Sequence, residues 1–255
     1  MSPLHSLIGK NFAVATTFPK ISTEGLVLHL DAGQQNSYKG SETTWTDLSG
    51  NSNTGTLVNG VGYSASNGGA LTFDGFNDYM RIPIFTNTPQ STMTLLYWIN
   101  FTQKGCIAQQ SRNYNDSLSE WMFQFDISGK LLFWDFGTID WGFNFETSNT
   151  TLSTNIWYQV GFVKNGTSGI FYLNGVQDGT VTAASNVAYG SNDYVMGFDY
   201  RDNNTYFGGK IAQALIYNRA LTATEIMQNF QTLRGRFFGQ SNMSFRGNNL
   251  SLLNI

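Results

Sequence analysis

Short runs of alternating apolar and polar residues, and not helical spacing, dominate the pattern along this chain. In the segment GLVLHLD, Leu26, Leu28 and Leu30 share one face, and Val27 and His29 share the other. This period of two is that of a β-strand, in which successive side chains point to opposite sides. We therefore predict a strand here, with His29 as a surface or packed strand residue and not as a ligand.

Similar segments follow at short intervals, separated by turn-forming residues. The pairs Ser128-Gly129 and Asn174-Gly175 are hairpin signals, because these residues tolerate the backbone angles of tight turns. Further strands are predicted over residues 70–73, 79–82, 91–102, 120–127, 130–136, 157–163, 169–173, 176–181, 194–198 and 210–217. So many short strands without intervening helices predict an all-β antiparallel sandwich or barrel.

One segment, residues 222–233, has the spacing of a short amphipathic helix. Thr222 is a suitable N-cap, and Glu225 follows at the spacing of a capping box. Ile226 and Phe230 then fall on one face, together with the last residue of the segment. The helix is thus expected near the C-terminal end of the β domain.

The 255 residues are predicted to form one β domain between two terminal segments of different charge. We assign an N-terminal arm to residues 1–22, the domain to residues 23–233 and a tail to residues 234–255. All 17 acidic residues lie between Glu24 and Glu225, although the whole chain has a net charge of only −3. The basic residues of the arm and tail are Lys10, Lys20, Arg234, Arg236 and Arg246. These ends are either solvated or dock on an acidic surface during assembly, on a neighbouring copy or another protein.

The composition excludes several classes of protein. Hydrophobic residues make up 41% and aromatic residues 15% of the chain, which is enough to fill a core and argues against disorder. No apolar run reaches the roughly 18 residues of a membrane span. The acidic body has no basic stripe with interleaved aromatic residues, so we expect neither nucleic acid nor a membrane surface as a partner.

The single cysteine, Cys106, cannot form an internal disulfide and is expected to be a buried thiol. Only His5 and His29 could serve a catalytic thiol or serine as a base, and no Gly-x-Ser-x-Gly motif is present. The first 20 residues lack the apolar segment of a secretory signal peptide. We therefore expect a chain that is made in a cytoplasm and kept there or released by lysis.

Four stretches, read together, resemble the concanavalin A-like, laminin-G-type jelly-roll family. Two of them contain the motifs LTFDGFNDYMRIP, residues 71–83, and FYLNG, residues 171–175. The other two cover residues 25–57 and 208–226. The resemblance implies two antiparallel sheets packed face to face, in a jelly-roll sandwich with one short helix near the C-terminus and extended terminal arms.

Some members of this family bind calcium, which directs attention to two acidic loops. We expect Asp74, Asn77 and Asp78 to stabilise a tight turn, with a hard-oxygen metal site as the alternative. The second acidic loop contains Asp193, Asp199, Asp202, Asn203 and Asn204. Neither has the spacing of an EF-hand loop, so no metal or other cofactor is assigned, and structural calcium stays open.

Glucanases with this fold need two carboxylates close together on one strand face. Glu120 and Asp126 could share a face, but six residues of strand separate them by about 20 Å. Asp135 and Asp140 have odd spacing and would face opposite sides of one strand, and the remaining pair is Asp140 with Glu146. The sequence therefore favours a protein that is not an enzyme.

Aromatic and polar side chains that could bind a sugar are concentrated in residues 113–145. Aromatic faces stack on sugar rings, while amides and carboxylates bond the hydroxyl groups. The candidates for ligand binding are Tyr114, Trp134, Trp141, Asp140 and Asn144. Trp121, in the same region, is expected to be a core residue.

A laminin-G-type domain without a signal peptide resembles the jelly-roll virion proteins of tailed bacteriophages. This resemblance implies a structural protein of the virion, such as a capsid decoration, appendage or fibre subunit. Its partners would be other virion proteins, further copies of itself and a glycan of the host surface. A free lectin or adhesin domain is the alternative, and a polysaccharide-cleaving enzyme is the third.

Overall fold

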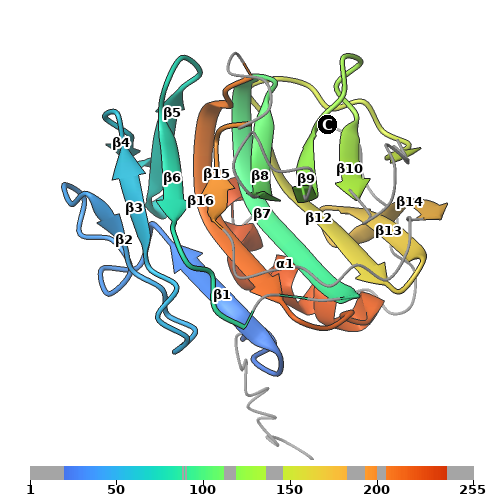
Figure 1. Cartoon of the computed structure of the whole chain (residues 1–255). Coiled ribbons are helices and arrows are strands. Elements are labelled where there is room, and N and C mark those ends of the chain that lie inside the picture. The colour runs from blue at the N-terminus through green and yellow to red at the C-terminus, as the bar shows by residue number, and fades with distance from the viewer. Residues whose placement is uncertain are drawn as a thin grey trace, which may run out of the picture.

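Two antiparallel sheets pack face to face, and one α-helix lies against the outer face of one of them (Figure 1). This computed structural model describes residues 20–87, 89, 91–111, 119–135, 146–182, 193–199 and 205–239. The two-sheet sandwich predicted from the sequence is thereby confirmed, and the barrel is not formed.

Sheet A contains eight strands that come from all parts of the chain. They are β1 (Leu26–Asp31), β4 (Gly62–Ser64), β5 (Ala70–Asp74), β7 (Thr92–Gln103), β12 (Trp157–Asn165), β13 (Ser168–Leu173), β14 (Val176–Thr182) and β16 (Gly208–Tyr217). Their order is β14-β13-β12-β7-β16-β5-β4, and β1 pairs with β16 beside β5. The longest strands, β7 and β16, are thus neighbours although more than 100 residues separate them, and their register brings Trp98 opposite Gln213.

Sheet B also contains eight strands, and its order is β11-β10-β9-β8-β15-β6-β3-β2. These strands are β2 (Thr44–Trp45), β3 (Gly55–Val58), β6 (Tyr79–Ile82), β8 (Cys106–Ser111), β9 (Ser119–Phe125), β10 (Leu131–Asp135), β11 (Glu146–Thr147) and β15 (Tyr194–Met196). The helical elements are the short 3-10 helix η1 (Ser66–Gly68) and the helix α1 (Ala223–Phe238).

Aromatic side chains of both sheets fill the space between them. The rings of Phe133 and Phe162 stack across the sandwich with their centroids 4.0 Å apart. Trp121 is fully buried, as predicted, and its indole N–H donates to Gln110. Cys106 is also buried, as expected of a thiol without a disulfide partner. Because this core is continuous, the fold needs no covalent cross-link for its stability.

A hydrogen bond between two tyrosines joins the sheets inside this core. The hydroxyl oxygens of Tyr97 on β7 and Tyr194 on β15 lie 3.0 Å apart, and neither side chain is exposed. Burial raises the pKa of both hydroxyls, so both stay protonated at neutral pH. One hydroxyl donates to the other, so both oxygens take part in a hydrogen bond inside the core.

The predicted faces of β1 are wrong at its first two residues. The pairing of β1 with β16 is shifted between Leu26 and Leu28, which indicates a β-bulge. Val27 therefore joins Leu28 and Leu30 in the core between the sheets, whereas Leu26 packs against a cluster on the outer face of sheet A. A strict period of two cannot reveal this shift, because a bulge inserts one extra residue into the strand.

The helix begins where the sequence predicts and ends five residues later than predicted. The Thr222 side chain accepts from the backbone N–H of Glu225, and the Glu225 carboxylate accepts in return from that of Thr222, so the capping box is confirmed. The end at Leu233 is wrong because Phe237 continues the apolar face and stacks on Trp98, with centroids 4.3 Å apart. Residues 234–238, assigned to the tail, thus form the last turn of α1.

Candidate functional site

Of the five predicted sugar-binding residues, the structure describes Trp134, which lies near one end of sheet B. Trp134 is the penultimate residue of β10, where it is half-buried and faces outward opposite Met122 of β9. The neighbouring Phe133 points into the core. The other four candidates, Tyr114, Asp140, Trp141 and Asn144, lie outside the described residues, as do Lys10 and Arg246.

The register of sheet B relates the segments that carry these candidates to each other. The end of β8 at Ser111 lies opposite the start of β9 at Ser119. At the same end, the last residue of β10 lies opposite Trp121. The segments 112–118 and 136–145 therefore both start at the end of sheet B at which Trp134 lies.

The acidic turn between β5 and β6 is held together by its own backbone. The Asp74 carboxylate accepts from the backbone N–H groups of Phe76, Asn77 and Asp78, which lowers the pKa of Asp74. Asp78 is buried and accepts from the backbone N–H of Asp74. These bonds account for the two carboxylates as turn residues, the structural role predicted for them.

The other predicted acidic residues either contact neighbouring residues, are buried, or lie outside the described residues. Asp193 forms an ion pair with Arg81, and Asp199 is buried. Asp126 accepts from Ser128 within the β9–β10 turn. In the described part of the chain, no three His, Cys, Asp or Glu residues are grouped closely enough to hold a metal ion. The positions of Asp202, Asn203 and Asn204 lie outside the described residues.

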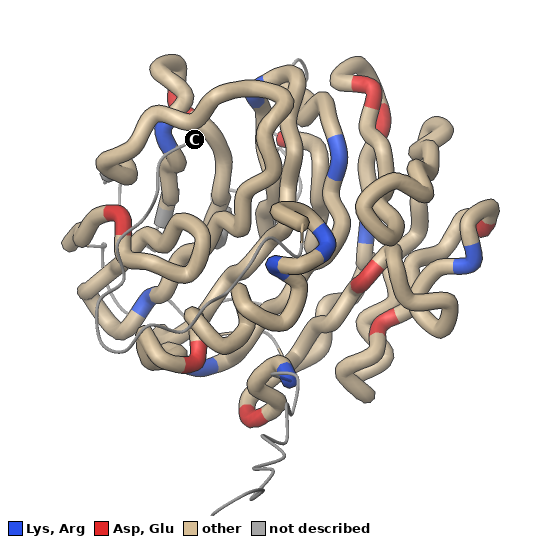
Figure 2. Tube along the Cα trace, turned by 180° about the vertical axis from the view of Figure 1, so that it is seen from behind, with Lys and Arg blue, Asp and Glu red and all other residues tan. Residues whose placement is uncertain are grey.

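The basic residues at the described ends of the chain contact the sandwich. Arg236 forms an ion pair with the buried Asp31, with 2.7 Å between Nη1 and Oδ1, and donates to the carbonyl of Gly69. The backbone carbonyl of Lys20 accepts from Gln228 of α1, and Arg234 lies on the same helix. The described Lys and Arg residues are scattered over the molecule, without a continuous stripe among them (Figure 2). No helix of the described chain combines the length and apolar character needed to cross a membrane.

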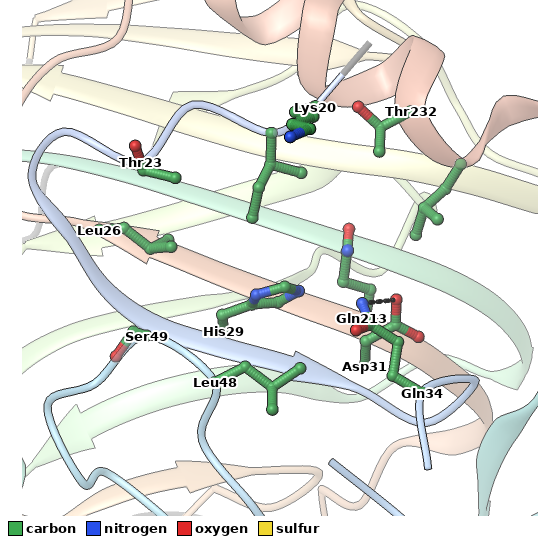
Figure 3. Close-up of a pocket in the computed structure, with 12 residues that line it drawn as sticks. Lys20, Thr23, Leu26, His29, Asp31, Gln34, Leu48, Ser49, Gln213 and Thr232 are labelled. Atoms are coloured by element: carbon green, nitrogen blue, oxygen red, sulfur yellow. Dashed lines mark hydrogen bonds between the residues drawn. The ribbon is translucent and has the colours of Figure 1, made fainter. Parts of the chain in front are cut away.

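A cavity that sequence reasoning missed lies on the outer face of sheet A, and we name it the β1 groove. It has a volume of about 420 Å³ and lies between β1, β16, α1 and the segment that precedes β1 (Figure 3). Its lining residues are Lys20, Ile21, Thr23, Leu26, His29, Asp31, Gln34, Leu48, Ser49, Gln213, Thr232 and Leu233.

The polar side chains of the β1 groove differ in how many hydrogen bonds they form with other residues. The Asp31 carboxylate accepts from Arg236, from the backbone N–H of Gly33 and from the Gln34 amide. By contrast, Nε2 of His29 is buried and has no hydrogen-bond partner among the described residues. Gln213 is only 2% exposed and lines the same cavity. Burial lowers the pKa of His29, so its ring is neutral at neutral pH.

The sequence contains weak signals for this cavity. His29 was predicted to be a strand residue that packs or faces solvent, and it does lie half-buried on β1, but on the wall of a cavity. Gln213 interrupts the otherwise apolar run IAQALIY of β16. A polar residue in such a run is unexpected at a buried position, but only the tertiary structure brings it close to His29.

A family model of the concanavalin A-like lectin/glucanases superfamily matches residues 73–227, more than half of the chain. The chain belongs to this superfamily. The laminin-G-type resemblance of the sequence motifs is thereby confirmed, together with the sandwich fold of this superfamily. No curated protein matches the chain.

Solved structures share the fold at low sequence identity. Domain 4 of AbnA, an extracellular arabinanase from Geobacillus stearothermophilus, was solved in complex with arabinotriose; it has 17% identity and a TM-score of 0.62, over 81% of this chain and 98% of that one. The binding domain of Paraclostridial Mosquitocidal Protein 1 has 16% identity and a TM-score of 0.65, over 82% and 52%. The receptor binding domain of botulinum neurotoxin type G has 16% identity and a TM-score of 0.59, over 81% and 51%. The chain thus spans about half of each toxin domain, and these likenesses establish the fold alone.

Proposed function

We propose that this superfamily member is a non-catalytic carbohydrate-binding domain whose glycan site lies at the Trp134 end of sheet B. The observation that carries the proposal is the position of Trp134, half-buried and facing outward where the segments with Tyr114 and Trp141 begin. Aromatic faces near amide and carboxylate groups suit a sugar, whose C–H faces are apolar and whose edges carry hydroxyl groups. The match to almost the whole of a domain solved with arabinotriose supports the same function.

A glycan array with the full chain tests this proposal. We expect binding to a restricted set of oligosaccharides, and a loss of at least tenfold in affinity for Trp134→Ala and for Trp141→Ala. Phe76→Ala is the matched control, because Phe76 is 75% exposed on the turn before β6, at the end of sheet B away from Trp134. Binding that survives both tryptophan substitutions, or no binding to any glycan, would refute the proposal.

The absence of catalysis is tested separately. Incubation with a panel of polysaccharides should release no new reducing ends. Release of sugar that is lost in Glu120→Gln or Asp140→Asn would show that the domain is a polysaccharide-cleaving enzyme instead.

A structural role in a tailed-phage virion is the finer part of the proposal. It is supported by the charge pattern, with a predicted body of net −8 and positive terminal segments. Substitutions that remove the charges of Lys10 and Arg246 test the role of the arm and the tail, because Arg236 is already paired with Asp31. Mass spectrometry of purified particles should detect the chain. Its presence only in soluble host fractions would favour a free lectin or adhesin domain.

A further inference from the structure

Four polar or aromatic side chains lie in one row across the outer face of sheet A. Asp31 of β1 pairs with Gln213 of β16, which pairs with Trp98 of β7, which in turn pairs with Gln159 of β12. Residues that are directly opposite on neighbouring strands point to the same side of a sheet. The row therefore lies on the face that α1 covers, as the stacking of Trp98 on Phe230 confirms.

Two of these side chains, Gln159 and Gln213, are buried glutamines in different surroundings. Both residues are 2% exposed. Both amide atoms of Gln159 are closed off from solvent and have no hydrogen-bond partner among the described residues. Gln213 instead lines the β1 groove, into which its amide projects together with the His29 ring (Figure 3).

The β1 groove has the composition of a small-ligand site. Aliphatic side chains, among them Leu26, Leu48 and Leu233, form much of its wall. Its volume of about 420 Å³ lies in the range of about 300–1,000 Å³ that is usual for small-molecule sites. Mostly apolar walls with a few convergent polar groups are typical of such sites.

The charges in the groove favour an uncharged ligand. The Asp31 carboxylate is neutralised by Arg236, and its oxygens already accept from protein donors. His29 is neutral, which leaves Lys20 at the rim as the remaining charged group of the lining. A neutral amide and a neutral imidazole can each donate or accept, which matches hydroxyl groups.

We propose that the β1 groove is a second ligand site, which binds one neutral sugar residue through the Gln213 amide and the His29 ring. The C–H groups of the sugar would pack on the leucine side chains, and its hydroxyls would bond the Gln213 amide and supply the partner that His29 Nε2 lacks. This site goes beyond the proposed glycan site, because it lies on the outer face of the other sheet and uses none of the same residues.

Titrations of the full chain with single sugars test the site. The probes are L-arabinose, D-galactose, D-glucose and N-acetyl-D-glucosamine, followed by NMR through the side-chain amide signals of Gln213. We expect saturable shifts of these signals for at least one sugar. Gln213→Leu and His29→Phe should each weaken the binding of that sugar at least tenfold.

Gln159→Leu is the matched control, since it removes an equally buried amide that has no access to the groove. Neither it nor Trp134→Ala should change the affinity by more than twofold. If Gln213→Leu does not fold, Leu48→Phe narrows the groove from its wall and should weaken binding in the same way. No binding of any probe, binding unchanged in Gln213→Leu, or binding lost only in Trp134→Ala would overturn the proposal. Binding that is lost only in Trp134→Ala would contradict the β1 groove proposal but would still support the glycan site on sheet B. Conversely, a failure of glycan-array binding alone would contradict the sheet B proposal and leave the β1 groove proposal standing.

Discussion

Gln159 and Gln213 flank Trp98 at equivalent positions of sheet A, but different parts of the chain cover them. Over Trp98, the aromatic residues Phe230 and Phe237 of α1 form a closed layer. Over Gln213, the cover comes from the segment before β1 and from the side chains around the groove, and it leaves a cavity. The same residue type at the same depth in the sheet is therefore closed off in one place and accessible to a ligand in the other. The difference shows that the covering layer, and not the strand, decides which buried polar group can take part in binding.

The largest loss of stability is expected where the aromatic residues of α1 cover Trp98. We expect Phe230→Ala to lower the free energy of unfolding by about 3–4 kcal/mol, because it leaves a cavity against Trp98. Urea denaturation measures this loss. Phe238→Ala is the control, since Phe238 is 40% exposed and should cost much less. Equal losses would show that α1 is not held by the Phe230 contact.

The ion pair of Arg236 with Asp31 holds the end of α1 against β1, next to the β1 groove. Arg236→Met keeps the aliphatic stem but leaves a carboxylate that is 1% exposed without its cation. We expect a loss of about 2–3 kcal/mol in the free energy of unfolding. Lys39→Met removes an exposed ion pair with Glu42 and should change the stability by less than about 0.5 kcal/mol. A similar value for both variants would contradict a role for the buried pair.

The start of α1 depends on a carboxylate that titrates at low pH. The hydrogen bonds from Arg219, assisted by Thr222, lower the pKa of Glu225 from 4.5 to about 2. Since this pKa is lower in the folded state, the stabilisation is present above pH 4.5 and is lost as the pH falls towards 2. Glu225→Gln should cost about 1 kcal/mol at pH 7, and the difference from the unsubstituted chain should shrink at pH 3. A difference that is independent of pH would show that the charge does not matter.

The smallest effect on stability is expected at His29, in the β1 groove. Its pKa is lowered mainly by burial, against the opposing influence of Asp31 and Asp47. The unfolded state therefore binds the proton more readily, and stability should fall as the pH drops below 6.5. His29→Gln should flatten this part of the pH profile in denaturation experiments between pH 7 and 5. A ligand that fills the β1 groove should deepen the same pH dependence, because a neutral ring is required for binding. An unchanged slope in His29→Gln would place the titrating group elsewhere.

Much of the fold could be predicted from local patterns, because the strands either alternate with a period of two or are runs of β-forming residues, as in β7, and several end at Gly or Asn turns. The hairpin at Asn174-Gly175 is formed with both residues at positive φ, as the residue pair predicts. The strands β2, β3, β4, β8 and β11 were missed, since four of them are very short and the fifth, Cys106–Ser111, ends in polar residues. Their strand character arises from pairing with distant segments, which no local pattern contains.

The two candidate sites differ in how far they follow from the sequence. Trp134 and its neighbours form a local cluster of aromatic and polar residues, so composition alone was sufficient to select them. The β1 groove combines residues that lie more than 180 positions apart, such as His29 and Gln213. Only the pairing of β1 with β16 brings them together, and that pairing cannot be predicted from either strand alone.

The tyrosine pair in the core has a consequence for the relation between the two outer faces. Sliding one sheet over the other would separate the hydroxyls of Tyr97 and Tyr194 in a region that water does not reach. The two hydroxyls would then lose the hydrogen bond that they share, which makes a sheared arrangement unfavourable. The pair thus helps to fix the position of one sheet relative to the other. Two molecules bound on the opposite outer faces of the sandwich would therefore keep a constant separation and orientation.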